Sequence, residues 1–212
     1  IRGDLPIEVI SMGVDTELFN PNKYDQKIKE KYNLEGPFLL FVGRLAPEKG
    51  IQYLIQAMPE TIKRFPRTKL LIIGEGTLKQ ELKELTKKLN LQDNVLFLGK
   101  IENKRLPKYY ATADIFISPS LREGMPVSYI EAMACGKPLL VGNLPISREI
   151  IKPPLRGLLV KQRNKKDISN KIIYLLKNEV LLRKKGESSI IFVRENYTWS
   201  VISKKYKEIL RK

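Results

Sequence analysis

Short apolar segments alternate along the chain with longer segments in which apolar residues recur every three or four positions. The short segments have the length and composition of strands, and the longer ones have the periodicity of amphipathic helices. We predict strands at Ile7–Ile10, Phe38–Val42, Leu70–Ile73, Val95–Leu98, Ile115–Ile117, Leu139–Val141 and Leu158–Val160. Helices are predicted at about 50–64, 77–90, 104–111, 126–135 and 145–151. This alternation is typical of βα units around a mostly parallel sheet.

Four of the predicted strands are so uniformly apolar that both faces of the sheet must be covered. The segment after Val160 predicts helices only, at about 166–177, 179–194 and 199–210. Apolar stripes on the first and last of these helices can dock on the sheet layer. The predicted fold class is therefore α/β, a Rossmann-like doubly wound parallel sheet with extra C-terminal helices.

The length of 212 residues suits one domain of ordinary size with short additions. The chain begins at Ile1 without a methionine, in a segment that resembles the approach to a strand, so we expect it to be part of a longer protein. We divide it into residues 1–36, a strand and connecting segment from a preceding domain, residues 37–195, a Rossmann-like domain, and residues 196–212, a C-terminal helix.

Basic residues outnumber acidic residues by 39 to 23, which gives a formal net charge of +16. Residues 152–212 carry 17 basic and 5 acidic side chains, against 22 and 18 in residues 1–151. A basic face attracts nucleic acid, anionic lipid headgroups or phosphorylated substrates, but a lysine-rich solvated surface gives the same count. No long apolar run or signal-peptide pattern occurs, so we predict a soluble, cytoplasmic protein.

The chain contains no histidine and a single cysteine, Cys135. These counts exclude a Ser-His-Asp triad, a Cys-His pair, a histidine-ligated zinc site and an internal disulfide within the chain. Proton transfer must therefore rely on carboxylates, lysine, tyrosine or the substrate. Cys135 itself lies in an apolar helical pattern and is most simply a small core residue.

Ligands of open parallel sheets bind beyond the carboxyl ends of the strands, so the loops after the predicted strands are the candidate site. The segment Gly43–Gly50 follows the strand Phe38–Val42. Gly43 lets a ligand approach the backbone, and Arg44 and Lys49 can hold a diphosphate. Two surface charges that flank a turn would give the same pattern.

Gly74-Glu75-Gly76 follows the strand Leu70–Ile73 and begins like a dinucleotide-binding fingerprint. Lys79 stands where the third glycine of that fingerprint would be, which disfavours a nicotinamide-dependent oxidoreductase. We interpret the segment as a glycine turn that lets a ligand or another loop come close, or as a plain tight turn.

The segment Ser118–Pro138 contains a short predicted helix with a carboxylate at its start, Glu123, and another within it, Glu131. The neighbours of Glu131 are apolar, which indicates a half-buried side chain. A buried carboxylate is costly unless it is hydrogen-bonded. Its donors are either ribose or sugar hydroxyls, or a structural backbone or arginine partner.

Together these residues resemble the family 4 (group 1) glycosyltransferases, retaining enzymes of the GT-B type that use nucleotide-activated sugars. The resemblance covers almost the whole chain, and its specificity lies in the order and spacing of its parts. These parts are Phe41–Leu45 with Lys49-Gly50, Leu98–Ile101, Tyr110–Asp114, Glu123–Pro138, Gly157–Val160 and Tyr197–Trp199. The resemblance implies that residues 37–195 are the C-terminal, donor-binding domain and that the N-terminal, acceptor-binding domain is missing from this chain.

Carried over to this sequence, the resemblance implies catalytic roles for Glu123, Arg44 and Lys49. The two cations hold the donor diphosphate and neutralise the leaving group, and Glu123 lies beside the donor sugar. Further contacts to the nucleotide sugar are implied as well. The backbone at Gly43 lets the ligand come close, and Ile101 and Leu106 lie at the nucleobase. Sugar hydroxyls and phosphate are bound at Gly124, Met125, Pro126 and Val127, and the ribose at Glu131. No metal and no cofactor besides the donor are implied.

We therefore predict the donor-binding domain of a metal-independent hexosyltransferase, which moves a sugar from a nucleotide diphosphate sugar to an acceptor hydroxyl and is inactive as an isolated chain. The alternative is a non-catalytic basic module that binds anionic membrane or nucleic acid through residues 152–212. The few aromatic residues there give stacking on nucleic acid little support. A basic helical face can also hold the whole enzyme at the inner face of a membrane, so the two ideas are compatible.

Overall fold

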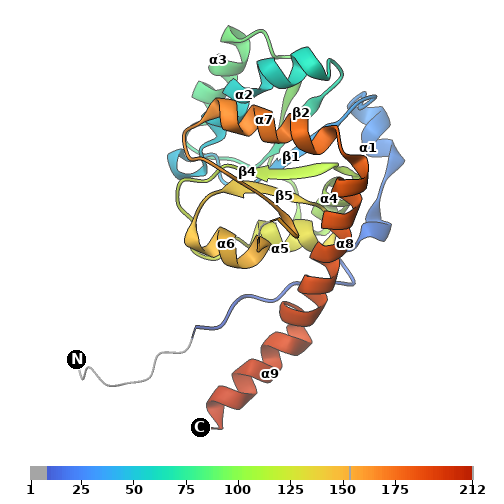
Figure 1. The fold of residues 1–212 in the computed structure, drawn as a ribbon, viewed down its shortest axis with the longest axis vertical. Coiled ribbons are helices and arrows are strands. Elements are labelled where there is room, and N and C mark those ends of the chain that lie inside the picture. The colour runs from blue at the N-terminus through green and yellow to red at the C-terminus, as the bar shows by residue number, and fades with distance from the viewer. Residues whose placement is uncertain (1–8, 153, 212) are drawn as a thin grey trace, which may run out of the picture.

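The computed structural model describes residues 9–152 and 154–211 (Figure 1). Its centre is a six-stranded sheet with the order β3-β2-β1-β4-β5-β6. The strands are β1 (Phe38–Val42), β2 (Lys69–Ile73), β3 (Val95–Gly99), β4 (Ile115–Ser118), β5 (Leu139–Gly142) and β6 (Gly157–Val160). Every strand pair is parallel. This is the doubly wound order of Rossmann-like folds, so the predicted fold class is confirmed.

Helices cover both faces of the sheet (Figure 1). One face carries α2 (Ile51–Arg64), α3 (Lys79–Lys88) and α7 (Lys165–Leu176). The other carries α1 (Gln26–Lys31), α4 (Leu106–Thr112), α5 (Val127–Ala134), α6 (Pro145–Ile151) and α8 (Glu179–Asn196). Short 3-10 helices occur at Pro21–Lys23, Pro47–Lys49 and Asn103–Arg105.

Strand β1 shows why its sequence is apolar at every position. Leu39 and Phe41 point into the core beneath α2 and α7, whereas Phe38 and Leu40 point into the core beneath α4 and α5. All four side chains are fully buried. A strand in the middle of a doubly wound sheet has no solvent face, so it needs no polar alternation.

Six of the seven predicted strands are confirmed, with ends that differ by at most one residue. The seventh, Ile7–Ile10, begins outside the described residues, and its described part, Val9 and Ile10, belongs to no strand. That prediction is wrong for the described part. The backbone pairing of this segment comes later, at Val14, whose amide donates to the Tyr197 carbonyl of the C-terminal segment at 2.7 Å. The predicted helices are present, and Cys135 is a fully buried core residue.

The N-terminal segment contributes to the same core as the sheet, since Phe19, Ile28 and Leu34 are buried with β1 and α4. The division at residues 36 and 195 stays a prediction. At the other end, α9 (Trp199–Leu210) projects away from the layers (Figure 1). Among the helices of the described ranges, none combines the length and apolar character needed to cross a membrane.

Candidate functional site

The strand order reverses at β1, which lies between β2 and β4, so the loops after β1 and β4 leave the same edge of the sheet in different directions. The loop after β1 runs from Gly43 to Gly50, and the loop after β4 runs from Pro119 to Pro126. They touch where the Leu121 amide donates to the Glu48 carbonyl at 2.7 Å. This is the crevice in which open α/β sheets bind their ligands.

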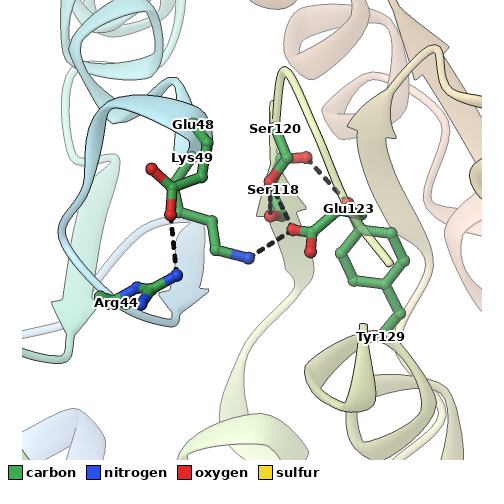
Figure 2. A network of polar contacts seen from close by, with 7 residues as sticks. All are labelled: Arg44, Glu48, Lys49, Ser118, Ser120, Glu123 and Tyr129. Carbon is green, nitrogen blue, oxygen red and sulfur yellow. Dashed lines mark hydrogen bonds and ion pairs between the residues drawn. The ribbon is translucent and has the colours of Figure 1, made fainter. Parts of the chain in front are cut away.

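Lys49 and Glu123 join the two loops through an ion pair (Figure 2). Lys49 Nζ lies 2.6 Å from Glu123 Oε1, and the side chains are 19% and 8% exposed. Ser120 Oγ donates to the same carboxylate oxygen at 2.7 Å and lies 3.0 Å from Ser118 Oγ. Glu123 Oε2 makes no hydrogen bond with any residue that the structure describes, so it is available to a ligand.

Arg44 belongs to the same loop as Lys49, but its guanidinium pairs with Glu48 at 2.8 Å (Figure 2). A hydrogen bond from the Glu48 backbone amide lowers the pKa of the Glu48 carboxyl, and the charge of Arg44 lowers it further against the opposing effect of desolvation. The Arg44 side chain is 71% exposed, and ion pairs in water contribute little stability. Arg44 can therefore exchange Glu48 for a stronger anion at low cost.

Tyr129 supports this arrangement from beneath. Its ring is fully buried, and its hydroxyl donates to the Ser118 carbonyl at 3.3 Å. Burial raises the pKa of the Tyr129 hydroxyl, so the side chain is neutral at physiological pH. The contact fixes the end of β4, from which Ser120 and Glu123 follow, against the first turn of α5.

Glu131 lies in α5 and is 8% exposed, so the expected half-buried carboxylate is in fact almost fully buried. The Tyr110 hydroxyl of α4 donates to Glu131 Oε2 at 2.8 Å. Burial raises the pKa of the Glu131 carboxyl, and the Tyr110 hydrogen bond opposes this only in part. Its protein partner is thus a tyrosine rather than a backbone group or arginine, and Oε1 makes no hydrogen bond with the described residues.

The structure brings the remaining predicted residues to the same edge of the sheet. Ile101 and Leu106, after β3, and Met125, before α5, are half-buried apolar side chains packed on the core beneath α4 and α5. Gly43 directly follows β1. Gly124, Pro126 and Val127 lie at the start of α5, where Gly124 and Val127 are exposed and Pro126 is buried.

Sequence reasoning missed the supporting polar residues Ser118, Ser120, Tyr110 and Tyr129. Ser120 precedes Glu123 by three residues, and this short spacing was a signal that could have identified it as a donor to the carboxylate. Tyr110 is 21 residues from Glu131, and no local pattern links the two.

Gly74 confirms the interpretation of Gly74-Glu75-Gly76 as a turn that another loop approaches. The Gly74 backbone has φ 141°, and a Cβ there would overlap the Gly43 carbonyl. The Leu45 amide donates to the Glu75 carbonyl at 2.8 Å. The turn after β2 therefore helps to place the loop that carries Arg44 and Lys49.

Other hollows of the described surface lie away from this crevice. One of about 720 Å³ lies between α2, α3 and α7, and one of about 570 Å³ lies beside α8 at the amino edge of the sheet. We place the candidate site at the crevice because the ion pair, the available carboxylate oxygen and the exposed cation converge there. Within the described ranges, no three His, Cys, Asp or Glu side chains group closely enough to hold a metal ion.

The sequence of this chain matches a known family and several of its members. A family model described as "Glycosyl transferases group 1" matches residues 22–190. An uncharacterized glycosyltransferase of Methanocaldococcus jannaschii is 32% identical over 203 residues, which are 93% of this chain and 52% of the relative. The GDP-mannose-dependent monoacylated alpha-(1-6)-phosphatidylinositol monomannoside mannosyltransferase of Corynebacterium glutamicum is 30% identical over 96% of this chain and 56% of the relative.

Solved structures share the fold as well. The sucrose-phosphate synthase of Thermosynechococcus elongatus superposes with a TM-score of 0.85 at 27% identity, over 96% of this chain and 52% of that protein. The chain therefore spans about half the length of each of these three proteins.

Proposed function

Because the chain belongs to the group 1 glycosyltransferases, we propose that it binds the nucleotide-sugar donor of such an enzyme. The whole enzyme moves a hexosyl group from the nucleotide diphosphate to an acceptor hydroxyl. The observation that carries the proposal is the crevice between β1 and β4, where the Lys49–Glu123 pair and Arg44 converge. The dependence on GDP-mannose in the name of the C. glutamicum relative supports a donor of this class.

The donor diphosphate is assigned to Arg44 and Lys49. Arg44 is exposed and leaves its weak pair with Glu48, so that its planar fork can hold two phosphate oxygens. Lys49 is half-buried and supplies a compact charge close to Glu123. Together they neutralise the charge that develops on the leaving diphosphate, which is the role that a metal ion has in other transferases.

The sugar and the nucleoside are assigned to the two sides of this pair. Glu123 Oε2 accepts a hydrogen bond from a sugar hydroxyl, and Glu131 Oε1 accepts one from the ribose. The backbone at Gly124–Val127 approaches the sugar and the phosphate at the start of α5. Ile101 and Leu106 pack against the nucleobase beyond β3.

We assign a retaining outcome to the reaction. The acceptor hydroxyl attacks on the face from which the diphosphate leaves, and the departing phosphate takes the proton. This route needs no histidine, of which the chain has none. Since the chain spans about half of its relatives, the acceptor-binding half lies in the rest of the enzyme, and the isolated chain binds donor without transferring sugar.

Thermal unfolding with uridine, guanosine and adenosine diphosphates tests donor binding. A ligand at about 100 times its dissociation constant adds about 2.7 kcal/mol of stability. For a chain of this length, the added stability raises the unfolding midpoint by about 5–10 °C. We expect one nucleotide to give this shift and Lys49→Ala to abolish it.

Lys171→Ala is the matched control, because Lys171 is also a half-buried lysine in an ion pair, with Asp167 at 2.8 Å within α7 and outside the loops that form the crevice. It should keep the shift. If the folded wild-type chain shows no shift with any of the three diphosphates, the proposal fails and the alternative of a basic binding module gains support.

A further inference from the structure

Two donors converge on one oxygen of the Glu123 carboxylate (Figure 2). Lys49 Nζ lies 2.6 Å from Glu123 Oε1, and Ser120 Oγ donates to the same atom at 2.7 Å. Glu123 Oε2 receives no hydrogen bond from any residue that the structure describes. The two oxygens of the carboxylate are therefore not equivalent, and Ser120 is one of the two groups that distinguish them.

The direction of the hydrogen bond behind Ser120 follows from the number of protons available. A serine hydroxyl has one proton to donate, and an ionised carboxylate has none. Ser120 gives its proton to Glu123, so Ser118 must be the donor in the contact between Ser118 Oγ and Ser120 Oγ at 3.0 Å. Ser118 is 2% exposed and Ser120 is fully buried, so water does not compete for these hydrogen bonds.

Tyr129 closes this group of hydroxyls on its buried side. Its own hydroxyl donates to the Ser118 carbonyl at 3.3 Å, and its ring is fully buried. Burial and, next, the charge of Glu123 raise the pKa of the Tyr129 hydroxyl, so a neutral phenol is held near that carboxylate. A buried polar network of this kind is rigid when its members are satisfied.

The backbone of Ser120 is held in place independently of its side chain. A Cβ at Gly142 of β5 would overlap the Ser120 carbonyl, and a Cβ at Gly50 would overlap the Pro119 carbonyl. The two glycines thus let neighbouring segments pack directly against the loop from two elements. Removal of the Ser120 hydroxyl should therefore leave the loop in place and change only what the hydroxyl holds.

The partners of the Ser120 hydroxyl differ from those of a serine with a local structural role. Ser169 and Ser189 are also buried, and each donates to a backbone carbonyl of its own helix. Within the described ranges, the Ser120 hydroxyl bonds only to the side chains of Ser118 and Glu123. It therefore serves the carboxylate of the candidate site rather than the backbone.

We propose that Ser120 is a positioning residue for the donor sugar, because it holds Glu123 with Oε1 toward Lys49 and Oε2 toward a sugar hydroxyl. This inference rests on the proposed function, in which Glu123 binds the sugar and Lys49 binds the diphosphate. Without the Ser120 proton, the carboxylate turns more freely, and Oε2 is no longer reserved for the sugar. Sugar binding then weakens, whereas the contacts to the diphosphate remain.

Calorimetric titration with paired ligands separates these two sets of contacts. The ligands are uridine, guanosine and adenosine diphosphates and the nucleotide sugars UDP-glucose, UDP-galactose, UDP-N-acetylglucosamine, GDP-mannose and ADP-glucose. Ser120→Ala should weaken binding of the preferred nucleotide sugar about tenfold, as expected when a hydrogen bond to a charged group is lost. The affinity for the matching diphosphate should change by less than about twofold.

Ser189→Ala is the matched control. It also removes a fully buried serine hydroxyl, which donates to the Lys185 carbonyl at 2.9 Å within α8. It should leave both affinities unchanged. Ser118→Ala should reduce nucleotide-sugar affinity in the same direction as Ser120→Ala but by less, and it carries the test if Ser120→Ala does not fold.

A double-variant cycle shows whether Ser120 acts through Glu123. Glu123→Gln should itself weaken nucleotide-sugar binding, and Ser120→Ala should cause no further loss in that background. The inference alone would be overturned by unchanged nucleotide-sugar affinity in Ser120→Ala, by equal losses for the sugar nucleotide and the diphosphate, or by a full additional loss beyond Glu123→Gln. If the folded wild-type chain binds none of the diphosphates, the proposed function fails as well.

Discussion

At the scale of a single residue, the buried carboxylate of Glu131 lowers the stability of the folded chain. It is buried in α5, and one tyrosine hydroxyl from α4 is its protein donor. Burial raises the pKa of the Glu131 carboxyl, so the folded chain holds the proton more tightly than the unfolded chain. The stabilisation from this proton is complete below the ordinary pKa of 4.5 and is lost as the pH rises through the raised value.

Glu131→Gln should therefore raise the unfolding midpoint at pH 7 by a few degrees, since about 1 kcal/mol corresponds to about 2–4 °C at this chain length. The amide oxygen can still accept from Tyr110, and no charge is buried. The gain should shrink as the pH falls toward 4.5. Nucleotide binding should weaken about tenfold, because the ribose loses a charged acceptor.

Asp114→Asn is the control for this prediction. Asp114 is also a carboxylate whose pKa is raised by burial, and it accepts from the Phe38 amide at 2.7 Å at the amino end of β1. It lies away from the candidate site, so nucleotide binding should be unchanged. Calorimetry of both variants across pH, with and without nucleotide, measures the change in unfolding midpoint and the change in nucleotide binding separately. Unchanged binding in Glu131→Gln would remove Glu131 from the donor site.

At the scale of elements, backbone contacts between loops set the shape of the site. Gly74, at the end of β2, has a φ of 141° and lies against the carbonyl of Gly43, at the end of β1. Gly124, at the start of α5, has no heavy atom within 4 Å of the place that a Cβ would occupy. The first glycine is required by the fold, whereas a Cβ at the second would enter open space.

Substitution of these two glycines by alanine should separate stability from binding. Gly74→Ala should cost at least about 1 kcal/mol, because alanine is strained at this φ and its Cβ meets backbone. Gly124→Ala should leave the unfolding midpoint of the free chain unchanged and weaken the binding of a nucleotide sugar. Unfolding midpoints without ligand and titrations with ligand measure the two effects. Unaltered sugar-nucleotide affinity in Gly124→Ala would contradict the proposed backbone approach.

At the scale of the whole molecule, the described chain is a complete layered core with its site at one open edge. Both faces of the sheet are buried beneath helices, and the loops of the crevice follow β1 and β4 at the carboxyl edge. Helix α9 extends from the layers with Trp199, Tyr206 and Leu210 exposed (Figure 1). The basic residues of 152–211 that the structure describes are spread over the segments that flank β6 and over α7, α8 and α9, and membrane binding through them stays a prediction.

The isolated chain should bind a nucleotide sugar and leave it intact. Attack on the donor requires an acceptor hydroxyl held beside the reacting carbon of the sugar, and positioning of this kind supplies several kcal/mol of the rate acceleration. The amount of free sugar and nucleotide released from the donor, measured by chromatography, should be the same with the wild-type chain, with the Lys49→Ala variant and with buffer alone. Turnover above the blank that is lost in Lys49→Ala would show that this chain contains the whole catalytic machinery.

The six strands, the helices that cover them and the buried Cys135 could be predicted because each depends on the periodicity of nearby residues. The resemblance to glycosyltransferase motifs likewise depended on local order and spacing, and it identified Lys49, Glu123 and Glu131 as candidates. The strand prediction at Ile7–Ile10 was wrong over Val9 and Ile10, because an apolar run pairs as a strand only where a sheet edge is within reach.

Only the tertiary structure decided which of these groups meet. Lys49 pairs with Glu123 across 74 residues of chain because the strand order brings β1 and β4 together, and Tyr110 reaches Glu131 because α4 packs beside α5. Local periodicity determines elements through short-range sterics and burial, whereas contacts between distant loops depend on how the sheet is wound.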